Sequence, residues 1–467
     1  MDSRRVFYNL SRCALVLVPC FLLIHSFIFL FPHNKSFAHD RSSAGIIYDA
    51  AYPLESSRPL KFHVADEVVA FLGKRPHAKT FADIPTIIKA CNSVGVDGWR
   101  DTSNCVNYLR DSEDEYLSIG KDDSFACNAE NPLKYHTYWR GPFTWRVSFM
   151  LKSFLFTQNL ECSKMYLWLD ADWDEDTVEV AMESPVLAPF LPLVRSGLIN
   201  LRAWKYPTGV YIPRHYRDNQ EYNHEGMLTF RQHQIPRGAV AVSDSVRFII
   251  LHQEGGLYTD MDTMFLKDLR PLLIAPDMSF AERWGAHPGP GEYNTAYLRL
   301  QANSSLSSRA IQGAARMGLN FHPRVLGRLL AKSEHENDLV MFETGVFDPL
   351  WSFFDHDAIG FCTVPCFGDF AQFYNKRPIP GEWSTLRPED KLPGTSPGNR
   401  TLSNFFRGAY AHHIHNQWSK HVVPGSWVWV ADQTYNQFFR GQRTNLYGED
   451  WSRAPIDFAT DEAAYRP

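Results

Sequence analysis

The chain of 467 residues contains few cysteines, no large excess of charge of either sign, and only one long apolar run. Its 28 glycines and 29 prolines are too few for a low-complexity chain. The 47 basic and 52 acidic residues nearly balance and form no basic stripe, which argues against binding nucleic acid over a broad basic face. No internal repeat is visible. With 44% hydrophobic and 14% aromatic residues, the chain is neither disordered nor fibrous.

The one long apolar run covers residues 13–31 and carries no formal charge. About twenty apolar residues span a bilayer core, so the run predicts a transmembrane segment. Three arginines precede it, which places the N-terminus in the cytoplasm by the positive-inside rule. A cleaved signal peptide is the alternative, with Ser36-Phe37-Ala38 as a small-residue cleavage site, but the run exceeds the usual h-region of about 7–15 residues. We expect a single-pass type II anchor in the Golgi or endoplasmic reticulum membrane.

Six cysteines follow the apolar run, an even number that is compatible with three disulfides in an oxidising lumen. They are Cys91, Cys105, Cys127, Cys162, Cys362 and Cys366. Their spacing does not reveal which cysteines pair. Acceptor sequons at Asn34, Asn303 and Asn399 fit the same compartment.

The pattern of apolar and polar residues changes near residue 130. Residues 1–12 form the expected cytoplasmic tail, 32–129 a stem and Cys-bearing segment, 130–435 the main domain, and 436–467 a C-terminal extension. Beyond residue 130, apolar strand-like runs alternate with amphipathic helical runs, which is typical of an α/β domain. The pattern predicts strands at 134–139, 165–169 and 198–204, and a helix at 145–158. The proline-rich residues 377–398 are expected to form a loop within this domain.

The most informative stretch is AVSDSVRFIILHQEGGLYTDMDTMF, residues 241–265. Apolar spacing predicts a helix over 242–254 with Ser243 as a possible N-cap, ended by Gly255 and Gly256. Residues 257–265 are expected to form a strand. Alternation along that strand would point Asp260 and Asp262 to the same side.

Two neighbouring carboxylates repel one another, so a cation must usually offset them. Mn²⁺ or Mg²⁺ prefers oxygen ligands and leaves coordination positions open for a diphosphate. On the preceding helix Asp244 and Arg247 share a face at i,i+3 spacing, which suits sugar hydroxyls beside a phosphate, although an ordinary surface ion pair gives the same spacing.

A second Asp-x-Asp at Asp170-Ala171-Asp172 is interpreted mainly as a solvated strand end. The longer pattern around Asp260 is more specific: Ser-Asp-x-x-Arg, seven residues, then Gly-Gly-x-Tyr-x-Asp-x-Asp. It resembles the sugar-binding region of the Asp-x-Asp glycosyltransferases, which include fungal α-1,6-mannosyltransferases, inositolphosphorylceramide mannosyltransferases, α-1,4-galactosyltransferases and the clostridial glucosylating toxins. The matching positions are Ser243, Asp244, Arg247, Gly255, Gly256, Tyr258, Asp260 and Asp262.

Looser similarity extends over residues 130–430. Trp139 corresponds to the aromatic position against the nucleotide base, although it could equally be a core tryptophan. Asn294-Thr295-Ala296 and Phe342-Glu343-Thr344-Gly345 resemble segments that line the sugar pocket, but Val346 stands where the family usually has proline. The segment from Ala411 resembles the family's closing Ala-x-His-x-Trp-Asn, in which His413 aligns best as a metal ligand and His415 remains the alternative.

The resemblance implies a nucleotide-diphospho-sugar transferase (GT-A type) mixed-sheet sandwich with residues 130–435 as its catalytic domain. It implies a metal-dependent, retaining transfer of a hexose from a nucleotide-diphosphate sugar to a glycan, glycoprotein or glycolipid, with Mn²⁺ or Mg²⁺ as cofactor. The residues implied for catalysis are Asp244, Arg247, Asp260 and Asp262; for donor binding Trp139, Asp244, Arg247, Tyr258, Asp260 and Asn294; and for the metal Asp260, Asp262 and His413.

Three alternatives remain open from the sequence alone. A catalytically inactive carbohydrate-binding relative would keep the same motifs. A glycoside hydrolase also uses paired carboxylates, but places them on opposite sides of the scissile bond, about 5–9.5 Å apart. A membrane-anchored adhesion or scaffold protein would bind no nucleotide sugar.

Overall fold

The computed structural model describes residues 74–92, 105, 108–109, 112, 115–118, 129–275, 278–285, 287, 289–333, 335, 337–349, 408–415 and 427–458. The chain divides into two units, residues 1–58 and 59–467, and the described residues all belong to the second. The expected anchor at residues 13–31 and the expected loop at 377–398 lie outside them. Within the described ranges no single helix is long and apolar enough to cross a membrane. One pair of helical segments, Thr177–Glu183 and Ala188–Arg195, meets the length and composition criteria together, but the pair is bent by 92°.

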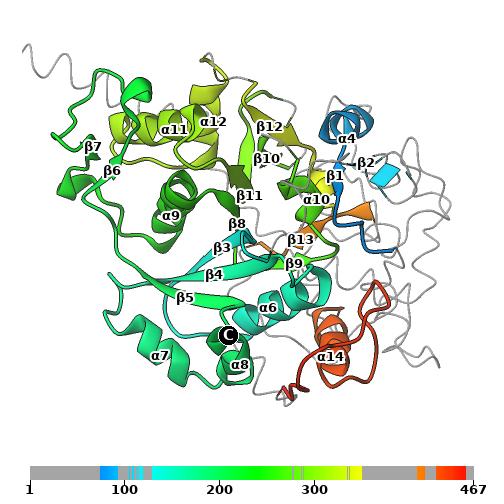
Figure 1. The fold of residues 1–467 in the computed structure, drawn as a ribbon. Coiled ribbons are helices and arrows are strands. Elements are labelled where there is room, and N and C mark those ends of the chain that lie inside the picture. Colours follow the sequence, from blue (N-terminus) through cyan, green and yellow to red (C-terminus); the bar gives the residue numbers. More distant parts are fainter. Residues whose placement is uncertain are drawn as a thin grey trace, which may run out of the picture. The chain divides into compact units, whose positions relative to one another are not determined.

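A mixed seven-stranded sheet forms the centre of the described fold (Figure 1), with the strand order β12-β10-β11-β8-β3-β4-β5. These strands are β3 (Leu133–Trp139), β4 (Ser163–Asp170), β5 (Ile199–Trp204), β8 (Gly256–Thr259), β10 (Ser279–Arg283), β11 (Tyr293–Leu300) and β12 (Leu339–Phe342). Strands β8, β3, β4 and β5 are parallel, whereas β11 runs antiparallel to both of its neighbours. The predicted α/β class and the three predicted strands are therefore confirmed.

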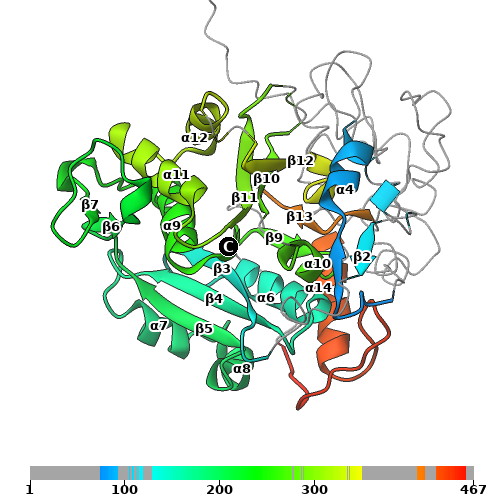
Figure 2. The same ribbon diagram turned by 45° about the horizontal axis from the view of Figure 1, so that its top comes forward.

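Helices lie on both sides of the sheet, as two views agree (Figures 1 and 2): α9 and α11 on one side, and α6, α7 and α8 on the other. The helices are α4 (Ile84–Cys91), α6 (Trp145–Thr157), α7 (Thr177–Glu183), α8 (Leu191–Arg195), α9 (Ala239–Glu254), α10 (Arg270–Leu273), α11 (Ser305–Arg316), α12 (Pro323–Leu330) and α14 (Trp427–Phe439). Helix α6 is the one expected at 145–158. Val246, Ile249 and Ile250 of α9 are fully buried in the hydrophobic core on their side of the sheet.

Three two-stranded sheets accompany the main sheet. They pair β1 (Thr80–Ala82) with β2 (Tyr116–Ser118), β6 (Gly209–Tyr211) with β7 (Met227–Thr229), and β9 (Thr263–Phe265) with β13 (Ala411–His413). In the last pair, antiparallel register sets His413 opposite Thr263. A segment far along the chain thereby delivers its histidines directly beside the Asp-x-Asp motif.

Segments outside the predicted main domain pack against it. The guanidinium of buried Arg270 donates to the backbone carbonyls of Pro76, His77 and Ala78, which come from the expected stem. Helix α14 crosses the predicted boundary at residue 435, and Tyr435 packs against Phe149 and Phe156 of α6. Cysteines 91 and 105 form a disulfide.

Two glycines end α9 as predicted, because both adopt the left-handed region, with φ of 67° at Gly255 and 101° at Gly256. A Cβ on Gly256 would lie 2.6 Å from the carbonyl oxygen of Lys134 on β3. The missing side chain thus permits close approach of β8 to β3.

We predict that Gly256→Ala lowers the free energy of unfolding by at least about 1–3 kcal/mol, through backbone strain and the clash with β3. Gly289→Ala is the control, since Gly289 has no positive φ and its added Cβ would approach no atom closer than 3.4 Å. Denaturant unfolding of both variants measures the difference. Equal stabilities would contradict this account of the α9–β8 junction.

Candidate active site

The Asp-x-Asp motif lies in a turn, so the expectation of one continuous strand over 257–265 is wrong. Strand β8 ends at Thr259, residues 260–262 form the turn, and β9 begins at Thr263 in a different sheet. The Thr263 hydroxyl donates to the carbonyl of Asp260 at 2.8 Å and lies 2.9 Å from the Thr259 hydroxyl, which closes the turn. The alternation rule fails here because polar side chains and the pairing of β9 with β13 break the strand.

Helix α9 begins four residues earlier than Ser243, with Gly238 as its N-cap, so the expected capping role of Ser243 is wrong. Ser243 instead lies inside the helix, where its hydroxyl accepts from Arg247 Nη2 at 3.1 Å and pairs with the Tyr258 hydroxyl at 3.1 Å. The serine and tyrosine of the motif therefore connect α9 to β8 through side-chain hydrogen bonds.

Arg247 is the buried centre of the motif. Its Nη2 lies 3.2 Å from Asp244 Oδ1 and 3.0 Å from Asp260 Oδ1, and its Nη1 donates to the Thr295 hydroxyl at 3.0 Å. The alternative of an ordinary surface ion pair between Asp244 and Arg247 is excluded, because the Arg247 and Asp244 side chains are only 6% and 9% exposed. Burial raises the pKa of Asp244 to about 6, although the positive charge of Arg247 lowers it. The negative charge of Asp260 acts in the same direction as burial.

His413 stands on the other side of the turn and forms an ion pair with Asp262. Its Nε2 lies 3.1 Å from Asp262 Oδ1, and both side chains are nearly buried. Burial alone would lower the pKa of His413, but the carboxylates of Asp262 and Asp260 outweigh it and raise that pKa to about 9. One ligand atom each from Asp260, Asp262 and His413 lies within 4.8 Å of the others, so these three residues can share a cation.

Register places two other predicted residues at the same edge of the sheet. Strands β3 and β8 are parallel with His136 opposite Tyr258, so Trp139 at the end of β3 lies level with the 260–262 turn. Trp139 is 9% exposed, and its indole donates to the carbonyl of Pro142 at 3.0 Å. Asn294 is the second residue of β11, beside the same turn, and donates to Glu282 Oε2 at 3.0 Å.

Two acidic residues near the site were not predicted. Glu282 on β10 is fully buried, and its Oε1 has no hydrogen-bond partner among the described residues. Burial raises the pKa of Glu282 well above its usual value, and the negative charge of Asp348 raises it further, which favours the neutral acid. Asp348, also buried, lies beside His412 and His415. Neither occurs in a motif, so only their burial beside the site reveals them.

The second Asp-x-Asp motif is structural, and its interpretation as a solvated strand end is wrong for Asp170. That carboxylate is 1% exposed and accepts hydrogen bonds from the Tyr138 hydroxyl and Arg140 Nε, each at 2.5 Å. It also accepts from the backbone N–H groups of Asp172 and Trp173. With these donors Asp170 closes the end of β4, whereas Asp172 is exposed.

Comparison with protein families finds one match. Residues 212–281, which include β8, the Asp-x-Asp turn and most of β10, match the glycosyltransferase sugar-binding region containing the DXD motif. The match identifies a DXD glycosyltransferase sugar-binding region within this chain. No curated protein matches it.

Three solved glycosyltransferase structures share distant similarity with this chain. The PaToxG glycosyltransferase is 12% identical over 67% of this chain and 95% of its own, with a TM-score of 0.29. GlyE of Streptococcus pneumoniae TIGR4 is 12% identical over 66% of this chain and 63% of its own, with a TM-score of 0.34. The bifunctional WbbM glycosyltransferase is 8% identical over 69% of this chain and 53% of its own, with a TM-score of 0.36.

We predict that Arg247→Gln destabilises the protein by about 3–5 kcal/mol, because Asp244 and Asp260 then lose their buried counter-charge. Arg202→Gln, at an exposed position on β5, is the control and should change stability by less than about 0.5 kcal/mol. Urea unfolding near pH 7.5 measures both. Similar losses of stability in the two variants would show that Arg247 does not stabilise the fold by balancing the charges of Asp244 and Asp260.

The raised pKa of His413 predicts opposite pH dependences for stability and metal binding. Without metal, the protonated His413 stabilises the fold fully below its ordinary pKa of 6.5, and that contribution disappears as the pH rises to about 9. A metal ligand must be deprotonated, so Mn²⁺ or Mg²⁺ affinity should rise up to about tenfold per pH unit over the same interval.

Calorimetric Mg²⁺ titration between about pH 6.5 and 8.5 measures this slope. His413→Gln serves as the control, because it lacks the titrating ring and should show a much flatter profile. A wild-type affinity that does not change with pH would contradict the assignment of His413 as a proton-competing ligand.

Proposed function

We propose that this protein is a metal-dependent hexosyltransferase of the GT-A type. It transfers a hexose from a nucleotide-diphosphate sugar to a glycan, glycoprotein or glycolipid. The observation that carries the proposal is the convergence of Asp260, Asp262 and His413 at one end of β8, beside the buried Asp244–Arg247 pair.

The donor set fits a hard divalent cation. The ligand atoms come from two carboxylates and one imidazole. The Asp260 side chain is 20% exposed, so the group is open to solvent on that side. Burial raises the pKa of Asp260, with Asp262 as a like-charged neighbour, so another positive charge here would be stabilising. Bound Mn²⁺ or Mg²⁺ would neutralise the charge that develops on a departing nucleoside diphosphate.

The protein's own groups have distinct proposed roles. Asp262 is the principal metal ligand, and Asp260 serves the metal and the ribose. Asp244 lies at a buried position where its carboxylate can accept hydrogen bonds from donor-sugar hydroxyls. The low dielectric of these surroundings would strengthen such bonds. Arg247 already contacts two carboxylates, Ser243 and Thr295, so we assign it chiefly to holding Asp244 and Asp260 at the sugar and metal positions.

The edge of the sheet supplies the remaining donor contacts. Trp139 is proposed beside the nucleotide base, and Asn294 and Tyr258 beside the sugar and its diphosphate, because all three belong to strands that meet the 260–262 turn. Retention of anomeric configuration and placement in the Golgi or endoplasmic reticulum membrane complete the proposal. The family resemblance supports the former, and the apolar run at residues 13–31 supports the latter.

The decisive experiment incubates the purified full-length chain with a panel of nucleotide sugars and measures release of nucleoside diphosphate, with Mn²⁺ or with chelator. We expect release with one donor class only when metal is present. Asp262→Asn should reduce turnover at least about 100-fold while the thermal unfolding profile stays cooperative.

Asp338→Asn is the matched control, because this half-exposed aspartate pairs with His335 and belongs to no proposed step. It should retain wild-type turnover. Metal-independent release, or normal turnover in Asp262→Asn, would overturn the proposed function. Binding of a donor without any release would identify an inactive relative.

A further inference from the structure

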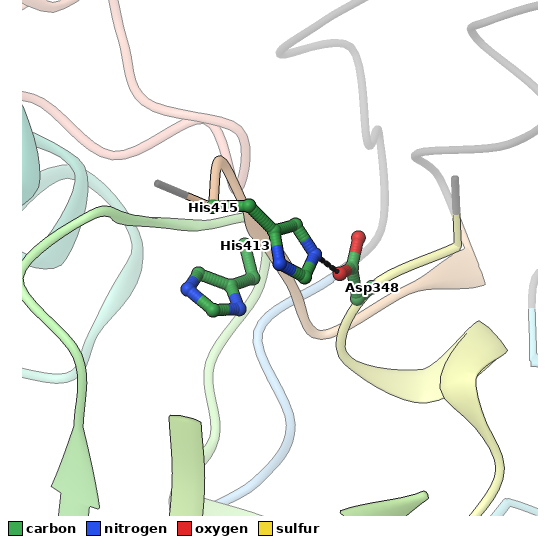
Figure 3. Close-up of side chains that lie close together, drawn as sticks. All are labelled: Asp348, His413 and His415. Carbon is green, nitrogen blue, oxygen red and sulfur yellow. Dashed lines mark hydrogen bonds and ion pairs between the residues drawn. The ribbon is translucent and has the colours of Figure 1, made fainter. Parts of the chain in front are cut away.

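We propose that Asp348, His413 and His415 form a second cation site, suited to Zn²⁺ or a similar transition-metal ion. One ligand atom from each of the three residues lies within 4.8 Å of the others. Figure 3 shows the two imidazoles and the carboxylate gathered at one place, where β13 passes the segment that follows β12. The set shares only His413 with the Asp-x-Asp group.

Contacts around Asp348 hold this group in place. His415 Nε2 is hydrogen-bonded to Asp348 Oδ2, and His412 Nδ1 lies 3.0 Å from Asp348 Oδ1. The Asp348 side chain is fully buried, and that of His415 is 13% exposed. His415 adopts a left-handed conformation with φ of 59°, which turns the chain so that its ring stacks on His413 with centroids 4.0 Å apart. The rings therefore converge although they are two residues apart at the end of β13.

The second nitrogen of His413 is the observation that points to a ligand. Nε2 of this ring faces Asp262, whereas Nδ1 is buried and has no hydrogen-bond partner among the described residues. A buried polar atom without a partner is costly, and a coordinated ion would satisfy it. Figure 3 shows the ring of His413 beside that of His415, which places this nitrogen close to the other two residues of the group.

The ligand chemistry separates the two cation sites. Two imidazoles and one carboxylate are a donor set typical of Zn²⁺ sites with an open coordination position, whereas two carboxylates with one imidazole favour a harder ion such as Mn²⁺ or Mg²⁺. A neutral imidazole has only one nitrogen lone pair to donate. His413 can thus serve one ion at a time, and Zn²⁺ at the second site would withdraw His413 from the Asp260–Asp262 site.

The experiment strips the full-length chain with chelator, dialyses it against ZnCl₂ and measures bound zinc by elemental analysis, with the visible spectrum of Co²⁺ as a second readout of nitrogen coordination. We expect Asp348→Asn and His415→Gln each to weaken Zn²⁺ binding at least about tenfold. Asp260→Asn should retain it, because Asp260 belongs only to the Asp-x-Asp group, whereas Asp262 hydrogen-bonds His413 itself. Circular dichroism verifies that each variant is folded, and His415→Gln is the less disruptive change because that ring is partly exposed.

His335→Gln is the matched control, because His335 belongs to another histidine–aspartate pair, with Asp338. It should bind zinc as wild type does. Unchanged zinc binding in both Asp348→Asn and His415→Gln overturns the proposal, as does loss of zinc in Asp260→Asn alone, which would place the ion at the Asp-x-Asp turn.

A second arm tests the competition, which rests on the proposed function. Zn²⁺ should raise the Mn²⁺ concentration needed for half-maximal thermal stabilisation of the wild type, and raise it less in His415→Gln. An equal rise in both variants overturns the competition. Zinc binding itself requires no turnover, so failure of the transferase assay would leave the zinc result interpretable.

Discussion

The structure depends on a buried arginine between carboxylates. Asp244 and Asp260 can share one small volume only because Arg247 lies within 3.2 Å of both. Isolated buried charges are unfavourable, and this arginine is itself fixed by Ser243 and Thr295. The spacing of the motif follows from this need: α9 supplies the cation, Gly255 and Gly256 reverse the chain, and the next strand returns an aspartate to the cation.

Asp262 receives its balancing charge from elsewhere. His413 reaches it from β13, and the same ring offers its second nitrogen to a different set of ligands. At the two proposed cation sites, a proton and either metal ion would therefore compete for one imidazole. The positive charge of Arg247 is permanent, whereas that of His413 is exchangeable, and this difference separates the part of the site that holds the fold from the part that responds to solution conditions.

Sequence predicted one half of the central sheet, because strands β3, β4 and β5 and helix α6 follow simple apolar patterns. It also predicted the glycine pair, whose conformation few other residues tolerate. It failed where side chains decide the backbone: the hydroxyls of Thr259 and Thr263 help to close a turn at Asp260, and Asp170 is buried by donors that lie up to 32 residues away. Asp348 and Glu282 have no local signal, since only tertiary packing brings them to the site.

The pairing of β9 with β13 has a temporal consequence. Asp262 and His413 are 151 residues apart, and their strands meet only when the C-terminal part of the chain is present. During synthesis every motif carboxylate leaves the ribosome well before the histidine that balances one of them. A chain that stops short of residue 411 would carry the recognisable DXD signature with an incomplete site, so intact motif and competent protein are separate properties of this molecule.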